Sequence, residues 1–124
     1  MHNSLQNAAT PAFNSADLLK RVENDQELLQ ELLTIFKQDY PLQLLSLREA
    51  ILRAEMKQVQ ASSHTLRGMF SNLAMARAAE AAASLERMGH NEEQTGLKDA
   101  LAFLEQELAD LMPVVDCYLQ GVPR

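Results

Sequence analysis

Apolar residues recur at intervals of three and four positions along most of the chain, which is the spacing that lines one face of an α-helix. After a first stretch without periodicity, Ser15 is positioned to cap a short helix that runs through Val22. Four longer amphipathic stretches follow, at about 24–52, 56–73, 75–88 and 97–115. Their short connections place neighbouring helices antiparallel. The pattern therefore predicts an all-α fold, an antiparallel up-and-down four-helix bundle with a short leading helix.

Capping residues mark the expected ends of these helices. Asn24 is followed three residues later by Glu27, an acid that can reach back to the cap and open the first long helix. Asn91 and Gln94 have the same spacing and are expected to cap the last helix. Gly89 is well placed to end the helix before it, because glycine readily adopts the left-handed conformation of a C-cap.

Two prolines interrupt the helical pattern. Pro41 either kinks one long helix or starts a second one, and since the apolar pattern resumes at once with Leu44 we favour the kink. Pro113 is expected to bend the end of the last helix. Before it, one apolar seam runs along that helix. Its residues are Leu97, Leu101, Leu104, Leu108, Leu111 and Val115.

Composition agrees with a single helical domain. The chain has 124 residues, 47% of them hydrophobic, and its four glycines and four prolines offer little turn chemistry for a sheet. We expect a flexible leader at 1–14, the bundle at 15–120 and a tail at 121–124. The single cysteine, Cys117, fits a reducing compartment and is expected to be a small buried hydrophobic side chain. Without a signal peptide or a membrane-spanning run, the protein is expected to be cytoplasmic, with no membrane insertion.

The charge distribution excludes some partners. A net charge of −6 argues against nucleic acid and against a membrane surface. Between Met56 and Met88, however, four basic residues stand against two acidic ones, so that the rest of the chain carries a larger negative charge. This locally basic middle indicates an acidic partner for that stretch.

His64 is the residue with the most distinctive surroundings. On a helical projection of 56–73, the core side is a single arc formed by Val59, Ser62, Leu66, Met69, Phe70 and Leu73. His64 lies about 160° from Leu66, so it should face solvent. The same exposed face carries Gln60, Arg67, Gly68 and Ser71.

The neighbours of His64 suggest more than a solvated surface histidine. Gly68 costs about 1 kcal/mol in the middle of a helix, and it leaves bare space one turn from the imidazole. Arg67, also one turn away, offers a positive charge and donors suited to a phosphate or a carboxylate. An imidazole, an open patch and a guanidinium together are typical of a site that accepts a phosphoryl group.

The chain resembles the histidine-containing phosphotransfer (HPt) domains of multistep phosphorelays. The resemblance rests on the run from His64 to Gly68, on Asn72 and on the pair Leu85-Glu86, and it extends from Asn24 to the final helix. The chain departs from the commonest pattern in three residues: Arg67 stands for lysine, Ser63 for alanine and Ala74 for glycine.

The resemblance implies that His64 takes a phosphoryl group from an aspartyl phosphate on one receiver domain and gives it to another. It also implies that Glu86 lies within hydrogen-bond reach of His64. A carboxylate that holds one ring N–H would fix the tautomer and leave the other nitrogen free as the nucleophile. His90 either approaches the phosphoryl surface or serves only as a favourable cation at a helix C-terminus.

The expected partners are receiver domains of a hybrid histidine kinase, of a response regulator, or of both. Magnesium is expected on the receiver, with no metal or other cofactor on this chain, and no ATP-binding motif is present that would make the chain an enzyme such as a kinase. We expect a monomer. The surface expected to contact the receiver is formed by Gln60, Ala61, Arg67, Gly68, Ser71, Asn72 and His90.

Two other functions remain open from the sequence. The first is the phospho-accepting domain of a chemotaxis-type histidine kinase, which would receive its phosphoryl group from an ATP-binding domain. The second is a helical adaptor that binds a receiver without transferring anything. The presence of His64 itself favours transfer over an adaptor role.

Overall fold

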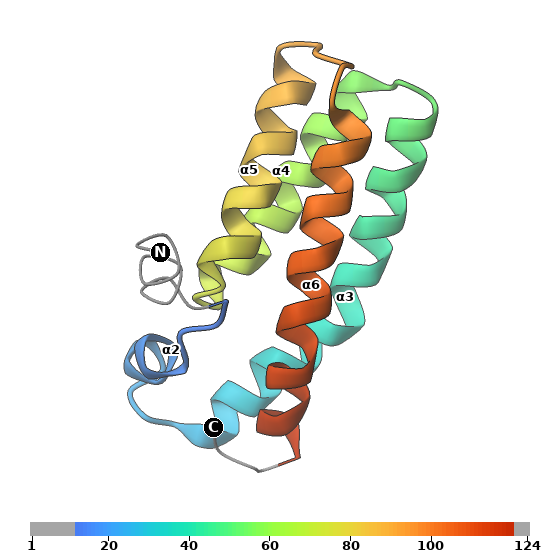
Figure 1. The fold of residues 1–124 in the computed structure, drawn as a ribbon. Coiled ribbons are helices and arrows are strands. Elements are labelled where there is room, and N and C mark those ends of the chain that lie inside the picture. Colours follow the sequence, from blue (N-terminus) through green and yellow to red (C-terminus); the bar gives the residue numbers. More distant parts are fainter. Residues whose placement is uncertain (1–11, 121–124) are drawn as a thin grey trace, which may run out of the picture.

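The computed structural model describes residues 12–120, and these residues form helices and connecting turns without a strand. The helices are α2 (Ser15–Arg21), α3 (Gln26–Leu52), α4 (Met56–Asn72), α5 (Ala76–His90) and α6 (Leu97–Leu119). Figure 1 shows α4, α5, α6 and the upper part of α3 side by side, with the short α2 at the lower end. The expected all-α bundle with a short leading helix is confirmed. The tail at 121–124 and leader residues 1–11, with His2, lie outside the described residues.

The two prolines that interrupt the helical pattern, Pro41 and Pro113, lie inside helices. Pro41 is within α3, which is one continuous helix as expected. Figure 1 shows the first part of α3 lying across the lower end of the bundle and the remainder standing upright. Pro113 is within α6, which continues beyond it to Leu119. Each proline lacks a backbone N–H and therefore removes one hydrogen bond of its helix, but neither helix ends there.

The expected N-caps are each wrong in detail. Asn14, and not Ser15, caps α2, because its side chain accepts a hydrogen bond from the backbone N–H of Asp17 at 3.0 Å. Asp25 caps α3 in the same way, through the N–H of Leu28 at 3.0 Å. Asn24 has a φ of 63° and belongs to the turn between the helices.

The connection before α6 also differs from the expectation. Asn91 is the C-cap of α5, and Gln94 lies in the following turn. Gly96, with a φ of 88°, takes the N-cap position of α6 without a side-chain hydrogen bond. A left-handed residue at this position turns the chain directly into the helix, so the capping box predicted from Asn91 and Gln94 does not form.

Gly89 does not end α5 as expected. It lies within the helix and is buried, and a Cβ atom added there would come within 2.6 Å of the backbone nitrogen of Gln60 in α4. The residue therefore allows close approach of two helix backbones. Along the same helix, Ala78, Ala81 and Ala82 are buried, and their small side chains take up little space between α5 and its neighbours.

Four helices end in the same left-handed turn, but none of them uses glycine for it. Glu23, Ala54, Ala74 and Glu92 follow the C-caps of α2, α3, α4 and α5 with φ values of 55°, 55°, 59° and 55°. The backbone N–H of Ala74 donates to the backbone oxygen of Ser71 at 3.3 Å, and the N–H of Met75 donates to the backbone oxygen of Phe70 at 2.9 Å. This pair of bonds is the Schellman motif, so the alanine keeps the turn for which glycine is the usual residue.

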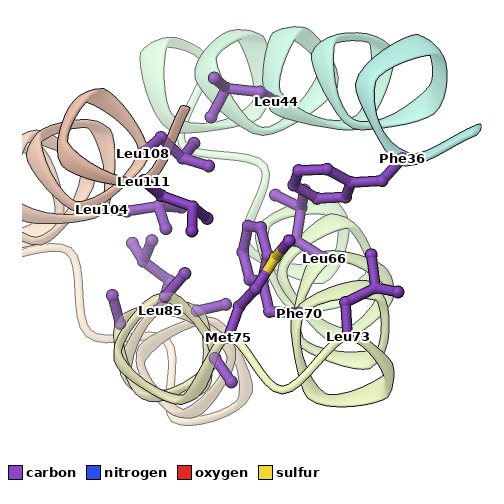
Figure 2. Packing of buried hydrophobic residues seen from close by; sticks show 14 of the residues in the cluster. Phe36, Leu44, Leu66, Phe70, Leu73, Met75, Leu85, Leu104, Leu108 and Leu111 are labelled. Atoms are coloured by element: carbon purple, nitrogen blue, oxygen red, sulfur yellow. The ribbon is translucent and has the colours of Figure 1, made fainter. Parts of the chain in front are cut away.

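The core fills the space between α3, α4, α5 and α6. In Figure 2, Phe36 and Leu44 from α3 point toward Phe70 of α4 and toward the leucines of α6. The rings of Phe36 and Phe70 pack edge to face, with centroids 5.9 Å apart. The predicted core arc of α4 is buried, apart from Met69, which is half-buried.

Some residues are placed differently from the sequence-based expectation. Phe13, assigned to the leader, is buried and packs edge to face against Tyr118, so the folded part begins before Ser15. Cys117 is half-buried and not buried. Ser63 is fully buried, and its hydroxyl has no hydrogen-bond partner. None of the helices in residues 12–120 has the length and apolar character needed to cross a membrane.

Candidate functional site

The imidazole of His64 lies on the exposed side of α4, next to a carboxylate of the neighbouring helix α5. The His64 side chain is 65% exposed, and its Nδ1 lies 2.8 Å from Oε2 of Glu86, whose side chain is 20% exposed. Close packing of the alanine-rich α5 on α4 brings these two residues together. Ser63, beside His64, is fully buried.

The contact with Glu86 decides which ring nitrogen of His64 is free. An ionised carboxylate only accepts hydrogen bonds, so Nδ1 must carry the proton and donate it to Glu86. In the neutral imidazole the lone pair then lies on Nε2, which makes no hydrogen bond to any residue in the described part of the chain. The exposed ring therefore presents a nucleophilic nitrogen to an incoming group.

Arg67 shares the same carboxylate. Its Nε lies 2.7 Å from Oε1 of Glu86, and its Nη2 lies 3.3 Å from Nδ1 of His64. Because Nδ1 already carries a proton, the second distance is a close approach and not a hydrogen bond. Glu86 thus orients the imidazole with one oxygen and the guanidinium with the other, and a positive charge is held beside the ring.

Gly68 leaves open space one turn beyond His64. A Cβ atom added at this glycine would meet nothing within 4 Å. Packing against other helices therefore does not require a glycine here, in contrast to Gly89. The bare backbone allows another molecule to approach the imidazole closely.

A shallow hollow of about 370 Å³ lies beside His64, between α4 and α5. The amide of Gln60 donates to Nδ1 of His90 at 3.3 Å on its border. The structure therefore brings His90 to the same surface as Arg67. Arg87, which the sequence analysis did not single out, also lines the hollow and adds a further positive charge.

An apolar groove of about 160 Å³ lies on the other flank, between α3 and α4. Its walls include Leu32 and Ile35 of α3 and Met69 of α4. Sequence reasoning missed this groove, because it depends on how two faces from distant segments meet. The expected contact residues Ala61, Ser71 and Asn72 are exposed on α4.

Arg21 is a second residue that the sequence did not reveal. Its guanidinium donates to the backbone oxygen of Ser71 at 2.8 Å, which docks α2 on the last turn of α4. The same guanidinium forms an ion pair with Asp17 at 2.9 Å. The spacing of Asp17 and Arg21 is the only signal in the sequence, and it gives no hint of the contact with α4. No three His, Cys, Asp or Glu side chains come together as a metal-binding group within residues 12–120.

Comparison with known proteins identifies the family. Residues 31–112, which include the His64 surface, match the family model of the Hpt domain. The chain belongs to the Hpt domain family. A phosphorelay function, in which a histidine transfers a phosphoryl group, follows for this Hpt domain.

The fold of the Hpt domain has a close structural counterpart. The crystal structure of histidine-containing phosphotransfer protein B from Pseudomonas aeruginosa PAO1 superposes with a TM-score of 0.84 at 21% sequence identity. The match covers 90% of this chain and 96% of that one. A comparison with curated proteins gave no significant match.

Proposed function

We propose that His64 accepts a phosphoryl group through Nε2 from the phosphoaspartate of one receiver domain and passes it to the aspartate of another. The observation that carries this proposal is the 2.8 Å contact between Nδ1 of His64 and Glu86, on a ring that is 65% exposed. It leaves Nε2 as the free nucleophile at a surface that a second protein can reach.

The chemistry requires no other nucleophile from this chain. The Nε2 lone pair attacks phosphorus, an N–P bond forms, and the P–O bond to the receiver aspartate breaks with release of its carboxylate. The proton on Nδ1 stays in place, so the imidazole ring becomes positively charged. Glu86 stabilises this charge through the hydrogen bond that it already accepts. The reverse sequence of bonds delivers the phosphoryl group to the next receiver.

The electrostatic contribution of this chain comes mainly from Arg67. Its guanidinium lies beside the ring and carries the charge that a phosphoryl group in transfer requires. Magnesium and an acidic pocket belong, in this proposal, to the receiver, so the Hpt domain needs no metal or cofactor of its own. In this role the Hpt domain passes on phosphoryl groups that receivers supply and takes none from ATP.

The surface around His64 is suited to a protein partner. Gly68 leaves the centre open, the apolar groove lined by Leu32, Ile35 and Met69 lies on one flank, and the hollow with Arg87 and His90 lies on the other. Apolar contacts contribute affinity, and basic groups attract an acidic protein. We infer that receiver domains of a hybrid kinase, a response regulator or both dock here.

The variant His64→Gln tests the proposal. The exposed side chain contributes little to packing, so the variant should keep the helical circular dichroism of the wild type and lose phosphoryl uptake from a phosphorylated receiver. His90→Gln is the matched control, since it removes the other histidine on this surface and should retain uptake. Labelling that persists in His64→Gln would exclude His64 as the acceptor.

A further inference from the structure

Among the described residues, Asp39 is the one charged side chain that lines the apolar groove between α3 and α4. The other lining residues are uncharged, and most of them are hydrophobic. Ile35, one turn before Asp39 on α3, is 47% exposed and so offers apolar surface to a partner. A side chain that enters this groove from another protein would therefore meet hydrophobic surface and one carboxylate.

The carboxylate of Asp39 is exposed and has no ionic partner within residues 12–120. Lys37, two residues earlier, is held by Asp116 of α6 at 2.6 Å. Arg21, which docks on the last turn of α4, is paired with Asp17 at 2.9 Å. These two cations are already matched to other carboxylates, so the negative charge at the groove is uncompensated in the described part of the chain.

The groove adjoins the acceptor site along one stripe of α4. His64, Gly68 and Asn72 follow one another at intervals of four residues, which places them one above the other on the helix. Asn72 lines the groove and lies about 12 Å from His64 along the helix axis. A protein that covers His64 and the open space at Gly68 can therefore reach the groove with the same surface.

The two flanks of the acceptor site carry opposite charge. On the α5 side, the hollow is lined by two arginines, Arg67 and Arg87, against one carboxylate, Glu86. On the α3 side, the groove has the carboxylate of Asp39 alone. Acidic groups of a partner suit the first flank and are repelled by the second. Opposite charges on the two flanks thus favour one direction in which a partner lies across the acceptor site.

We propose that Asp39 is a specificity residue, which selects receivers with a lysine or arginine next to the apolar side chain that enters the groove. This inference rests on the proposed function, since it takes a receiver as the partner. A receiver cation at this place would form an ion pair with Asp39. An acidic residue there would bring like charges together, which lowers affinity and excludes that receiver.

General electrostatics and the proposed ion pair predict opposite effects of removing this charge. In the proposed function, the receiver supplies an acidic pocket, so a carboxylate that acts only through overall charge would oppose association. Asp39→Asn would then strengthen association. If Asp39 pairs with a receiver cation, the same substitution weakens association, because the amide keeps the shape of the side chain but loses its charge.

The test uses the receiver domains encoded in the same genome, phosphorylated and incubated with the wild-type domain. For the receiver that transfers fastest, Asp39→Asn should weaken association about threefold at low salt, and Asp39→Lys should weaken it further. Higher salt should reduce both effects, because exposed charges are screened. Single-turnover transfer, measured against receiver concentration at two salt concentrations, gives these values.

The same measurement separates binding from chemistry. No hydrogen bond or ion pair joins Asp39 to His64, Arg67 or Glu86. Transfer at saturating receiver should therefore proceed at the wild-type rate in Asp39→Asn. Glu49→Gln is the matched control, since Glu49 is exposed on the same helix, has no ion pair within residues 12–120 and does not line the groove. Its substitution should not weaken association.

Charge reversal identifies the partner residue on the receiver. Each exposed lysine and arginine of the receiver is changed to aspartate in turn and combined with Asp39→Lys. At one position, the two reversals together should restore association to within about twofold of the wild type, because the ion pair forms again with exchanged charges.

The outcomes distinguish this inference from the proposed function. If no receiver phosphorylates His64, the proposed function and this inference both fail. If transfer occurs but association is unchanged or stronger in Asp39→Asn, the inference alone is overturned. The absence of any receiver position that rescues Asp39→Lys would also overturn it and leave the proposed function standing.

Discussion

Glu86 holds both His64 and Arg67, one with each carboxylate oxygen, at 2.8 Å and 2.7 Å. At the scale of single residues, this makes the guanidinium part of the proposed acceptor site before any partner arrives. A phosphoryl group on Nε2 of His64 would offer Arg67 a second anion. The position of Arg67 beside the ring therefore predicts an effect on the transfer step itself.

Arg67→Ala should slow phosphoryl transfer even when the receiver is saturating. An exposed charge-assisted contact contributes about 1 kcal/mol or less once water competes, which corresponds to about fivefold in rate. Arg67→Lys should recover most of the loss, because a point charge can also hold a phosphate. Single-turnover transfer at two salt concentrations is the measurement.

Arg87→Ala is the matched control for this prediction. Arg87 lines the neighbouring hollow, and its Nη2 contacts Ser84 at 3.5 Å and not His64. Its loss should weaken receiver association in a salt-dependent way and leave transfer at saturation unchanged. A defect in Arg67→Ala that also disappears at saturation would reduce Arg67 to the same steering role.

At the scale of elements, two glycines in neighbouring helices have opposite roles. An added Cβ meets open space at Gly68, whereas at Gly89 it would lie 2.6 Å from backbone of α4. Gly68→Ala should stabilise the fold by about 0.5–1 kcal/mol, because alanine is the better helix former. Gly89→Ala should destabilise it by about 1–3 kcal/mol through overpacking of α4 and α5. Urea unfolding of both variants measures these opposite signs.

Gly68→Gln should combine normal stability with slow transfer, since a long side chain would obstruct the surface beside His64. Transfer at the wild-type rate in Gly68→Gln would show that the open space is not used in docking. Equal stability changes in the two alanine variants would show that the contact of Gly89 with α4 does not constrain the bundle.

The turn after α4 offers a second prediction at this scale. Ala74 has a φ of 59°, a conformation that costs an alanine about 1–2 kcal/mol and a glycine almost nothing. Ala74→Gly should therefore raise the free energy of unfolding by about 1 kcal/mol. Ala61→Gly is the control, because the same change within α4 should lower stability by about 1 kcal/mol. A loss of stability in Ala74→Gly would contradict the role given to this turn.

Elements and boundaries differed in how well the sequence predicted them. The helices themselves could be predicted because apolar residues recur at helical spacing. These residues form one buried face of each helix, whatever the exact packing against it. Caps depend on backbone angles that neighbouring turns impose, so Ser15 and Asn24 were each displaced by one residue from the actual caps Asn14 and Asp25. A glycine at position 89 is typical of a helix end. Only the close packing of α4 against it shows why glycine is needed there.

At the scale of the whole molecule, the bundle separates surfaces of different character. The locally basic stretch predicted from the sequence lies in α4 and α5, where His64, Arg67 and Arg87 share one region. Five of the six exposed large hydrophobic side chains of residues 12–120 lie on α3. Since the net charge of the chain is −6, attraction to an acidic receiver must come from this local arrangement and not from overall charge.

The candidate site was predictable where it depends on a single helix. His64, Arg67 and Gly68 share one face of α4, and the resemblance to HPt domains supplied Glu86 from the next helix. The apolar groove between Leu32 and Met69 was not predictable, because it arises only when α3 and α4 pack at a particular register. The contact of Arg21 with α4 was missed for the same reason.

Phosphorus NMR of the phosphorylated Hpt domain, combined with mass-spectrometric mapping of the modified residue, tests the central claim most directly. After incubation with a phosphorylated receiver, we expect one phosphohistidine, at His64, with the N–P bond at Nε2. That isomer follows from the hydrogen bond between Nδ1 and Glu86. A signal from the Nδ1 isomer, or phosphate on another residue such as His90, would contradict the account.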